Sequence, residues 1–156
     1  MNEMNQPSRT RGLDCRAARV VPASPADVFR ALTDPQQMTQ WWGKTEKATL
    51  TSCDMDVQYG GSFRLAIRSA DGTEALVSGT YSEVDPGYRL AFTWTSANPA
   101  DAVADSRVRI ELLDLKDGTT RVVINQQDLP APSVVNVYSA GWHDVLQDLN
   151  MHFAGA

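Results

Sequence analysis

A long amphipathic helix at the end of the chain restricts the fold more than any other feature of the sequence. Residues 133–153 (SVVNVYSAGWHDVLQDLNMHF) carry apolar side chains at the 3.6-residue period of an α-helix, and a helix of that length measures about 30 Å. One face collects Tyr138, Trp142, Val145, Leu149 and Phe153. Asp148 falls on another face. We expect the apolar face to be buried against the concave side of a strongly curved sheet.

Six strands are predicted between Ala48 and Gln127, where the apolar period changes to two. Phe63, Leu65 and Ile67, for example, alternate with polar or small residues. The sequences ADG, DPG and KDG have the composition and the spacing of hairpin turns between such strands. The pattern therefore predicts an antiparallel sheet with one solvent-facing side.

One further strand and two short helices are predicted before this sheet. Leu13–Val21 alternates weakly and is interpreted as a strand. The stretch SPADVFRAL begins with a serine that can cap a helix and a proline that suits the first helical position. A second short helix is expected to begin at Asp34-Pro35 and to end at Gly43.

The length of 156 residues fits one domain. We assign residues 1–12 to a flexible N-terminal tail and residues 13–156 to one α+β domain. Its predicted architecture is a curved seven-stranded antiparallel sheet, two short helices after the first strand, and a long C-terminal helix over the concave face. No stretch has the apolar core of a signal peptide or the roughly 20 apolar residues of a membrane-spanning helix.

The charge of the chain limits the classes of partner, and its cysteines limit the kind of site and the cellular compartment. The chain has 19 acidic against 14 basic residues, a net charge of −5, which is the wrong sign for binding nucleic-acid phosphates or for stable association with an anionic membrane. Cys15 and Cys53 lack C-x-x-C spacing, so neither a disulfide framework nor a zinc site is expected. We expect two reduced thiols in a cytoplasmic protein.

No catalytic set of residues can be assembled from the sequence. His143 and His152 are nine positions apart, whereas two metal ligands on one helix are usually four apart, and no H-E-x-x-H pattern is present. We expect His143 on the solvated side of the helix, beside Asp144. The sequence thus predicts no catalytic residue, no metal and no cofactor.

Trp41 and Trp42 are adjacent in the stretch TDPQQMTQWWG. Neighbouring residues on a helix point about 100° apart, so the two rings cannot share one direction. We expect one ring to pack into the body of the protein and the other to reach the mouth of a cavity or the solvent. Packing of both rings within the helical corner is the alternative.

Aromatic and apolar side chains on the predicted inner faces are the candidate ligand-binding residues. The alternative is that they form the packed core, which is the commoner use of such a stripe. They are Trp41, Trp42, Phe63, Tyr81, Phe92, Trp94, Tyr138, Trp142, Val145 and Leu149. Tyr81 and Tyr138 are the best polar candidates, although each hydroxyl could instead be bonded to the backbone. Gly79 and Gly141 lie among these rings, and we expect them to permit close packing rather than to leave room for a ligand.

Four stretches, taken in order, resemble the START-like (SRPBCC) superfamily with its helix-grip fold, in the branch of the activator of the 90-kDa heat-shock-protein ATPase. They are ALTDPQQMTQWWG (31–43), GGSFRL (60–65), SGTYSEVDPGYRLAFTW (78–94) and AGWHDVLQDL (140–149). Lys44 and Gln126 depart from the pattern, since the family often has proline and histidine there. A polar ligand contact is therefore not carried over to Gln126.

The resemblance implies a fold and leaves three functions open. The first is binding of an apolar or amphipathic small molecule or lipid, without chemistry, between the sheet and the C-terminal helix. The second is a co-chaperone-like module that contacts a chaperone through its surface. The third is a cyclase- or hydrolase-type enzyme that uses cavity residues. Because the fold supports several activities, the choice depends on the cavity.

Overall fold

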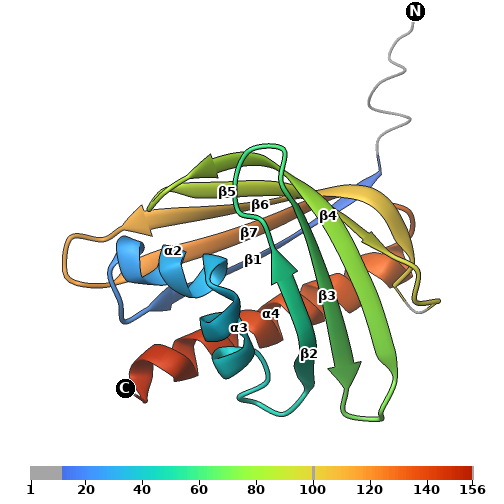
Figure 1. Ribbon diagram of the computed structural model, residues 1–156, viewed down its shortest axis with the longest axis horizontal. Helices are drawn as coiled ribbons and strands as arrows, with labels where there is room; N and C mark the ends of the chain where they lie inside the picture. Colours follow the sequence, from blue (N-terminus) through green and yellow to red (C-terminus); the bar gives the residue numbers. More distant parts are fainter. Residues whose placement is uncertain (1–11, 100, 156) are drawn as a thin grey trace, which may run out of the picture.

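The computed structural model describes residues 12–99 and 101–155, and the strands in these ranges form one antiparallel sheet of seven (Figure 1). The order across the sheet is β1-β7-β6-β5-β4-β3-β2. The strands are β1 (Leu13–Val21), β2 (Ala48–Met55), β3 (Ser62–Ser69), β4 (Glu74–Asp85), β5 (Arg89–Ser96), β6 (Val103–Asp114) and β7 (Thr120–Leu129). The predicted α+β fold is confirmed. Apart from Gly12, the tail predicted for residues 1–12 lies outside the described residues.

Two short helices follow β1, as predicted. Ser24 caps α2 (Pro25–Thr33) by accepting a hydrogen bond from the Asp27 backbone N–H. Asp34 caps α3 (Pro35–Trp41) in the same way, through the backbone N–H of Gln36. The two cap-and-proline pairs start separate helices, so the chain turns a corner here.

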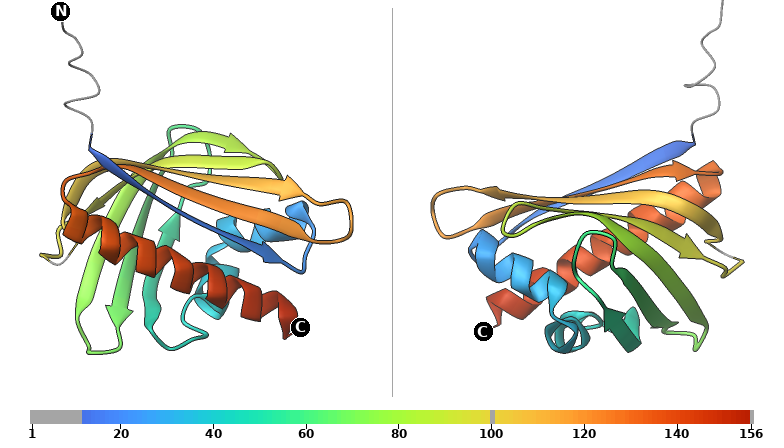
Figure 2. Two further views of the ribbon diagram at one scale, coloured as in Figure 1. Left: turned by 180° about the vertical axis from the view of Figure 1, so that it is seen from behind. Right: turned by 45° about the horizontal axis from the view of Figure 1, so that its top comes forward.

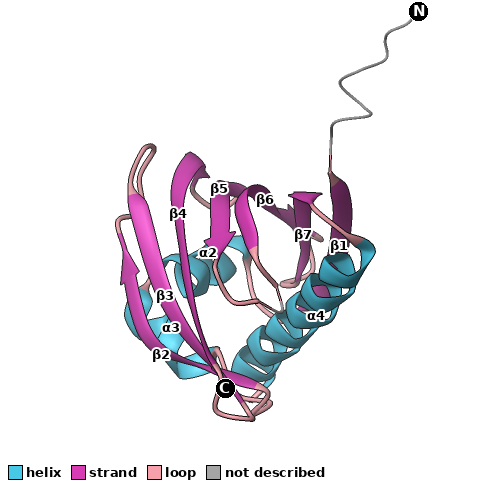
Figure 3. Cartoon of the chain, turned by 90° about the vertical axis from the view of Figure 1, so that its right-hand side faces the viewer, coloured by secondary structure: helices cyan, strands magenta, loops and turns pink. Residues whose placement is uncertain are grey.

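The long helix α4 (Pro132–Ala154) lies along the open side of the curved sheet (Figure 2). It packs mainly against β1, while α3 packs against β2. In the end-on view of Figure 3, α4 lies under the β1–β7 side of the sheet, and β2 and β3 curl down on the opposite side. The helix therefore covers one half of the concave face more closely than the other. Among the described residues, no helix combines the length and apolar character needed to cross a membrane.

The sheet bends where its register shifts and where β4 carries a glycine. Register shifts occur in β2 between Leu50 and Ser52 and in β4 between Tyr81 and Glu83, and such irregularities increase local bending. A β-carbon at Gly79 would lie 1.8 Å from the carbonyl oxygen of Thr93. The close approach predicted for this glycine is thus confirmed.

Both cysteines are free thiols on opposite edge strands of the sheet. Burial, with a contribution from Asp54, raises the pKa of Cys53 to about 11. Burial and then Asp14 raise the pKa of Cys15 as well. Since the thiolate is the reactive form, both side chains are poor nucleophiles in the folded protein.

We expect iodoacetamide at pH 8 to alkylate both thiols far more slowly in the folded protein than in urea. With a pKa of about 11, Cys53 would be about one-thousandth thiolate at that pH. Mass spectrometry over a time course measures the labelling of each cysteine. Equal rates in the two conditions would contradict the expectation.

Candidate functional site

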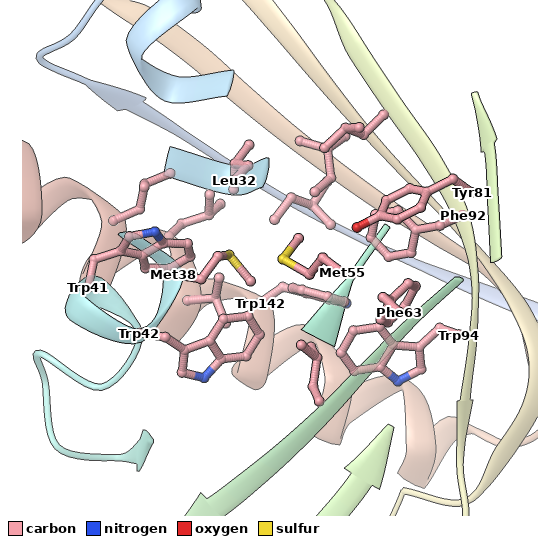
Figure 4. A pocket seen from close by; sticks show the side chains of 17 residues that line it. Leu32, Met38, Trp41, Trp42, Met55, Phe63, Tyr81, Phe92, Trp94 and Trp142 are labelled. Atoms are coloured by element: carbon pink, nitrogen blue, oxygen red, sulfur yellow. The ribbon is translucent and has the colours of Figure 1, made fainter. Parts of the chain in front are cut away.

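An apolar inner cavity lies between the sheet, the helical corner and α4 (Figure 4). Its free volume is about 50 Å³, close to the space of one or two water molecules. Side chains therefore fill most of the interior. A ligand of useful size could enter this cavity only if some of them moved.

Nine of the ten candidate residues line the inner cavity. They are Trp41, Trp42, Phe63, Tyr81, Phe92, Trp94, Trp142, Val145 and Leu149. Tyr138, the tenth, instead lines a groove that adjoins the cavity, between α4 and the β2–β3 side of the sheet. Ligand contact by these residues stays a prediction.

Sequence reasoning missed several apolar side chains that complete the cavity wall. They are Leu32, Met38, Met55, Leu65, Leu90, Ile110, Ile124 and Leu146. Alternation along the strands could have indicated Leu65 and Leu90, because each shares a strand face with a candidate aromatic residue, Phe63 on β3 and Phe92 on β5.

The tryptophan pair is buried as a unit. Trp41 is fully buried and donates its indole N–H to the carbonyl of Ala31 over 2.9 Å. The Trp42 ring stacks on it with 5.7 Å between centroids and 28° between planes, and it lines both the cavity and the groove. Trp41 packs into the body as expected, but Trp42 is buried against it, which agrees with the alternative that both rings pack within the helical corner.

A larger groove adjoins the cavity between α4 and the β2–β3 side of the sheet, where the helix covers the concave face least. Its volume is about 360 Å³, within the usual range for small-molecule sites. Groove and cavity share the side chains of Trp42, Trp94, Trp142 and Val145. Movement of these shared side chains would join the two spaces.

Gly141 faces this groove, and a β-carbon added there would have no heavy atom within 4 Å. The expectation of close packing is therefore wrong at Gly141. The helix has no side chain at the point where it faces β2 and β3, so the absence of a side chain creates open space.

We expect Gly141→Ala to raise the free energy of unfolding by about 0.5–1 kcal/mol. Alanine has the higher helix propensity and would clash with nothing at this position. Urea unfolding measures the change. A loss of stability would contradict the open space described here.

Three buried side chains form a hydrogen-bonded chain between α4 and the sheet. Trp142 donates its indole N–H to Oε1 of Gln126 over 2.7 Å. Nε2 of Gln126 donates to Oγ of Ser106 over 2.9 Å, and that hydroxyl donates to the carbonyl of Trp94. Gln126 is thus engaged in holding the helix to β6 and β7.

The two candidate tyrosines differ in their hydrogen bonding. The Tyr138 hydroxyl donates to the carbonyl of Asp101 over 2.8 Å and accepts from the Trp94 indole over 3.1 Å, so its bonding to the backbone is confirmed. The Tyr81 hydroxyl has no hydrogen-bond partner among the described residues, and Figure 4 shows it directed toward the other lining side chains. Burial raises the pKa of both phenols above the usual value.

Asp148 is buried, although the helical pattern placed it outside the apolar face. Its carboxylate accepts the backbone N–H groups of Gly43 and Thr45 over 2.9 and 2.6 Å. These bonds attach the segment after α3 to α4. A tertiary contact with backbone amides thus explains a buried charge that periodicity could not indicate.

The described lining of the inner cavity offers no acid–base pair. Tyr81 is the one titratable side chain in it, whereas general acid–base catalysis usually needs two groups of complementary function. His143 is exposed, as expected, with Nδ1 2.7 Å from the carbonyl oxygen of Ser139. In the part of the chain that the structure describes, no group of three His, Cys, Asp or Glu residues could hold a metal ion.

Comparisons with known proteins agree with this architecture. The family model described as "Activator of Hsp90 ATPase homolog 1-like protein" matches residues 22–154. No curated protein matches the chain.

Solved structures of similar fold come from several bacteria. Protein CV1439 from Chromobacterium violaceum is 26% identical over 90% of this chain and 97% of its own, with a TM-score of 0.72. Protein Ms6760 from Mycobacterium smegmatis is 18% identical over 90% of each chain, with a TM-score of 0.75. Protein NE0264 from Nitrosomonas europaea is 23% identical over 88% of this chain and 92% of its own, with a TM-score of 0.69.

Proposed function

The chain belongs to the family of Activator of Hsp90 ATPase homolog 1-like proteins, and from this premise we propose that it binds an apolar or amphipathic small molecule between the sheet and α4, without chemical conversion. A family of this fold supports more than one activity, so the proposal depends on the groove.

The observation that carries the proposal is the groove of about 360 Å³ beside Gly141. Trp94, Trp142 and Val145 are among its apolar lining residues, and several polar side chains line it as well. Concave sites with an apolar floor and few polar groups are typical of small-molecule binding.

The inner cavity is a second compartment that a ligand could enlarge. Met38 and Met55 line it, and unbranched methionine side chains adapt readily to a new occupant. The Tyr81 hydroxyl would offer a deeply placed ligand one hydrogen bond in otherwise apolar surroundings. Binding would thus begin in the groove and extend inward as side chains move.

Two free cysteines in a folded domain fit a reducing compartment. The proposal therefore includes a cytoplasmic location. It also includes a small-molecule partner, since the net charge of −5 disfavours a nucleic acid or an anionic membrane.

Filling the groove tests the proposal. Gly141→Leu places a side chain in the groove, and its β-carbon would meet no heavy atom within 4 Å, so we expect the variant to fold as the wild type does. Isothermal titration calorimetry with fatty acids, sterols and aromatic polyketides should give a ligand for the wild type and at least a tenfold weaker affinity for this variant. Gln147→Leu, on an exposed part of α4, is the matched control and should bind as the wild type does.

Two results would reject small-molecule binding in the groove. One is a wild-type protein that binds no member of the panel. The other is a Gly141→Leu variant with wild-type affinity. The first result would favour the alternative of a co-chaperone-like module that acts through its surface.

A further inference from the structure

The groove carries more acidic than basic side chains. Its charged lining residues are Lys47, Asp101, Asp144 and Asp148. The Asp148 carboxylate accepts two backbone N–H groups, and Asp101 accepts the hydroxyl of Ser96 over 3.0 Å. Three carboxylates against one ammonium make the groove a poor place for an anion.

Asp144 is the acidic residue of the groove that is free to meet a ligand. It is half-buried, and within residues 12–99 and 101–155 it has neither a hydrogen bond nor an ion pair. A half-buried carboxylate without a partner gains most from an incoming cation, because it has lost part of its hydration.

The helix geometry directs Asp144 toward the open space. Side chains on an α-helix lean toward its N-terminus and cover the preceding turn. Asp144 lines the same groove three residues after Gly141, where a β-carbon would meet nothing, so its side chain borders the open space. A ligand lying in this space would place a substituent within reach of the carboxylate.

A second side chain of the same groove, Trp42, has a hydrogen-bond donor that a ligand could use. Trp42 is 8% exposed, and its indole N–H has no acceptor among the described residues. Figure 4 shows the indole nitrogens of Trp42 and Trp94 on the same side of the cluster. The Trp94 indole N–H donates to the hydroxyl of Tyr138, and Tyr138 lines the groove and not the cavity. The Trp42 indole N–H thus lies on the groove side of the cluster.

We propose that the groove selects ring-bearing amines over the matching alcohols and carboxylates, and that Asp144 supplies the carboxylate that receives the ammonium group. The inference rests on the proposed function and adds the chemical class of the ligand. The rings of Trp94 and Trp142 would contact the apolar body. The indole N–H of Trp42 would donate a hydrogen bond to a ligand that carries an acceptor.

Three probes that share one ring system test the inference: 2-naphthylmethylamine, 2-naphthylmethanol and 2-naphthoate. Calorimetry at pH 7 should give the amine about a tenfold tighter affinity than the alcohol, since a hydrogen bond to a charged group contributes about this much. The carboxylate should bind most weakly. The preference should shrink at high salt, because part of the attraction is screened.

Two variants locate the source of the preference. Asp144→Asn should lower amine affinity about tenfold and leave alcohol affinity unchanged. Asp54→Asn changes the net charge equally, on an exposed part of β2 outside the groove, and should leave all three affinities unchanged. In a ¹⁵N NMR spectrum the Trp42 indole signal, assigned with Trp42→Phe, should shift on binding.

The outcomes separate the inference from the function on which it rests. If the alcohol or the carboxylate binds as tightly as the amine, the inference is wrong and the groove still binds ligands. The inference is also wrong if the amine preference survives in Asp144→Asn. Failure of all three probes to bind the wild type would count against both.

Discussion

Replacing Trp142 by alanine is expected to lower the free energy of unfolding by about 3–5 kcal/mol, the usual cost of removing a large buried ring. The ring is 5% exposed and lies edge-on to Trp94, with 5.1 Å between centroids. The substitution also leaves Oε1 of Gln126 without its donor inside the protein. Urea unfolding of the two proteins measures the loss.

Trp142→Phe separates the ring from its hydrogen bond. It keeps an aromatic side chain and removes the donor to Gln126, so a smaller loss of about 1–3 kcal/mol is expected. A loss below 1 kcal/mol for Trp142→Ala would mean that the ring stabilises the fold little. In that case the Trp142 ring would mainly line the cavity and would contribute little to core packing.

Asp148→Ala is expected to lower the free energy of unfolding by about 2–4 kcal/mol, because it leaves two partly buried N–H groups without an acceptor. The amides of Gly43 and Thr45 lose their bonds to α4. Their hydrogen exchange should accelerate beyond the change in global stability. The segment between α3 and β2, which borders the groove, should then separate from the helix.

Asp144→Ala is the matched control, one helical turn earlier. Asp144 has no partner among the described residues, so its removal should change stability by less than about 0.5 kcal/mol. Equal losses for the two variants would indicate that the bonds of Asp148 contribute nothing specific. Hydrogen exchange monitored by NMR gives the result for each amide separately.

The sequence predicted the elements well because local rules control them. The alternation that places Phe63 and Leu65 on one side of β3 depends on the two-residue period of any strand. The cap-and-proline pairs before α2 and α3 satisfy the first N–H groups of each helix from within the same segment. Such signals need no knowledge of distant residues.

Much of the site could not be predicted because it depends on tertiary contacts. Gln126 and Asp148 are polar side chains that the fold buries by giving them partners far away in the sequence. Gly79 and Gly141 are the same residue type, yet one is crowded by Thr93 and the other faces open space. Neither the apolar periodicity nor the composition of the sequence distinguishes the surroundings of these two glycines. The groove itself follows from the position of α4 over the β1 half of the sheet.

The position of β1 has a consequence for how the chain folds. This first strand pairs with the last one, so that Leu13 lies opposite Leu129. A contact between residues so distant in the chain requires closure of a very long loop, and folding rates fall as contacts become less local. During synthesis β1 must also wait for β7 to leave the ribosome before the sheet can be completed. We therefore expect the edge β1–β7 to form late, with β1 open to other partners until then.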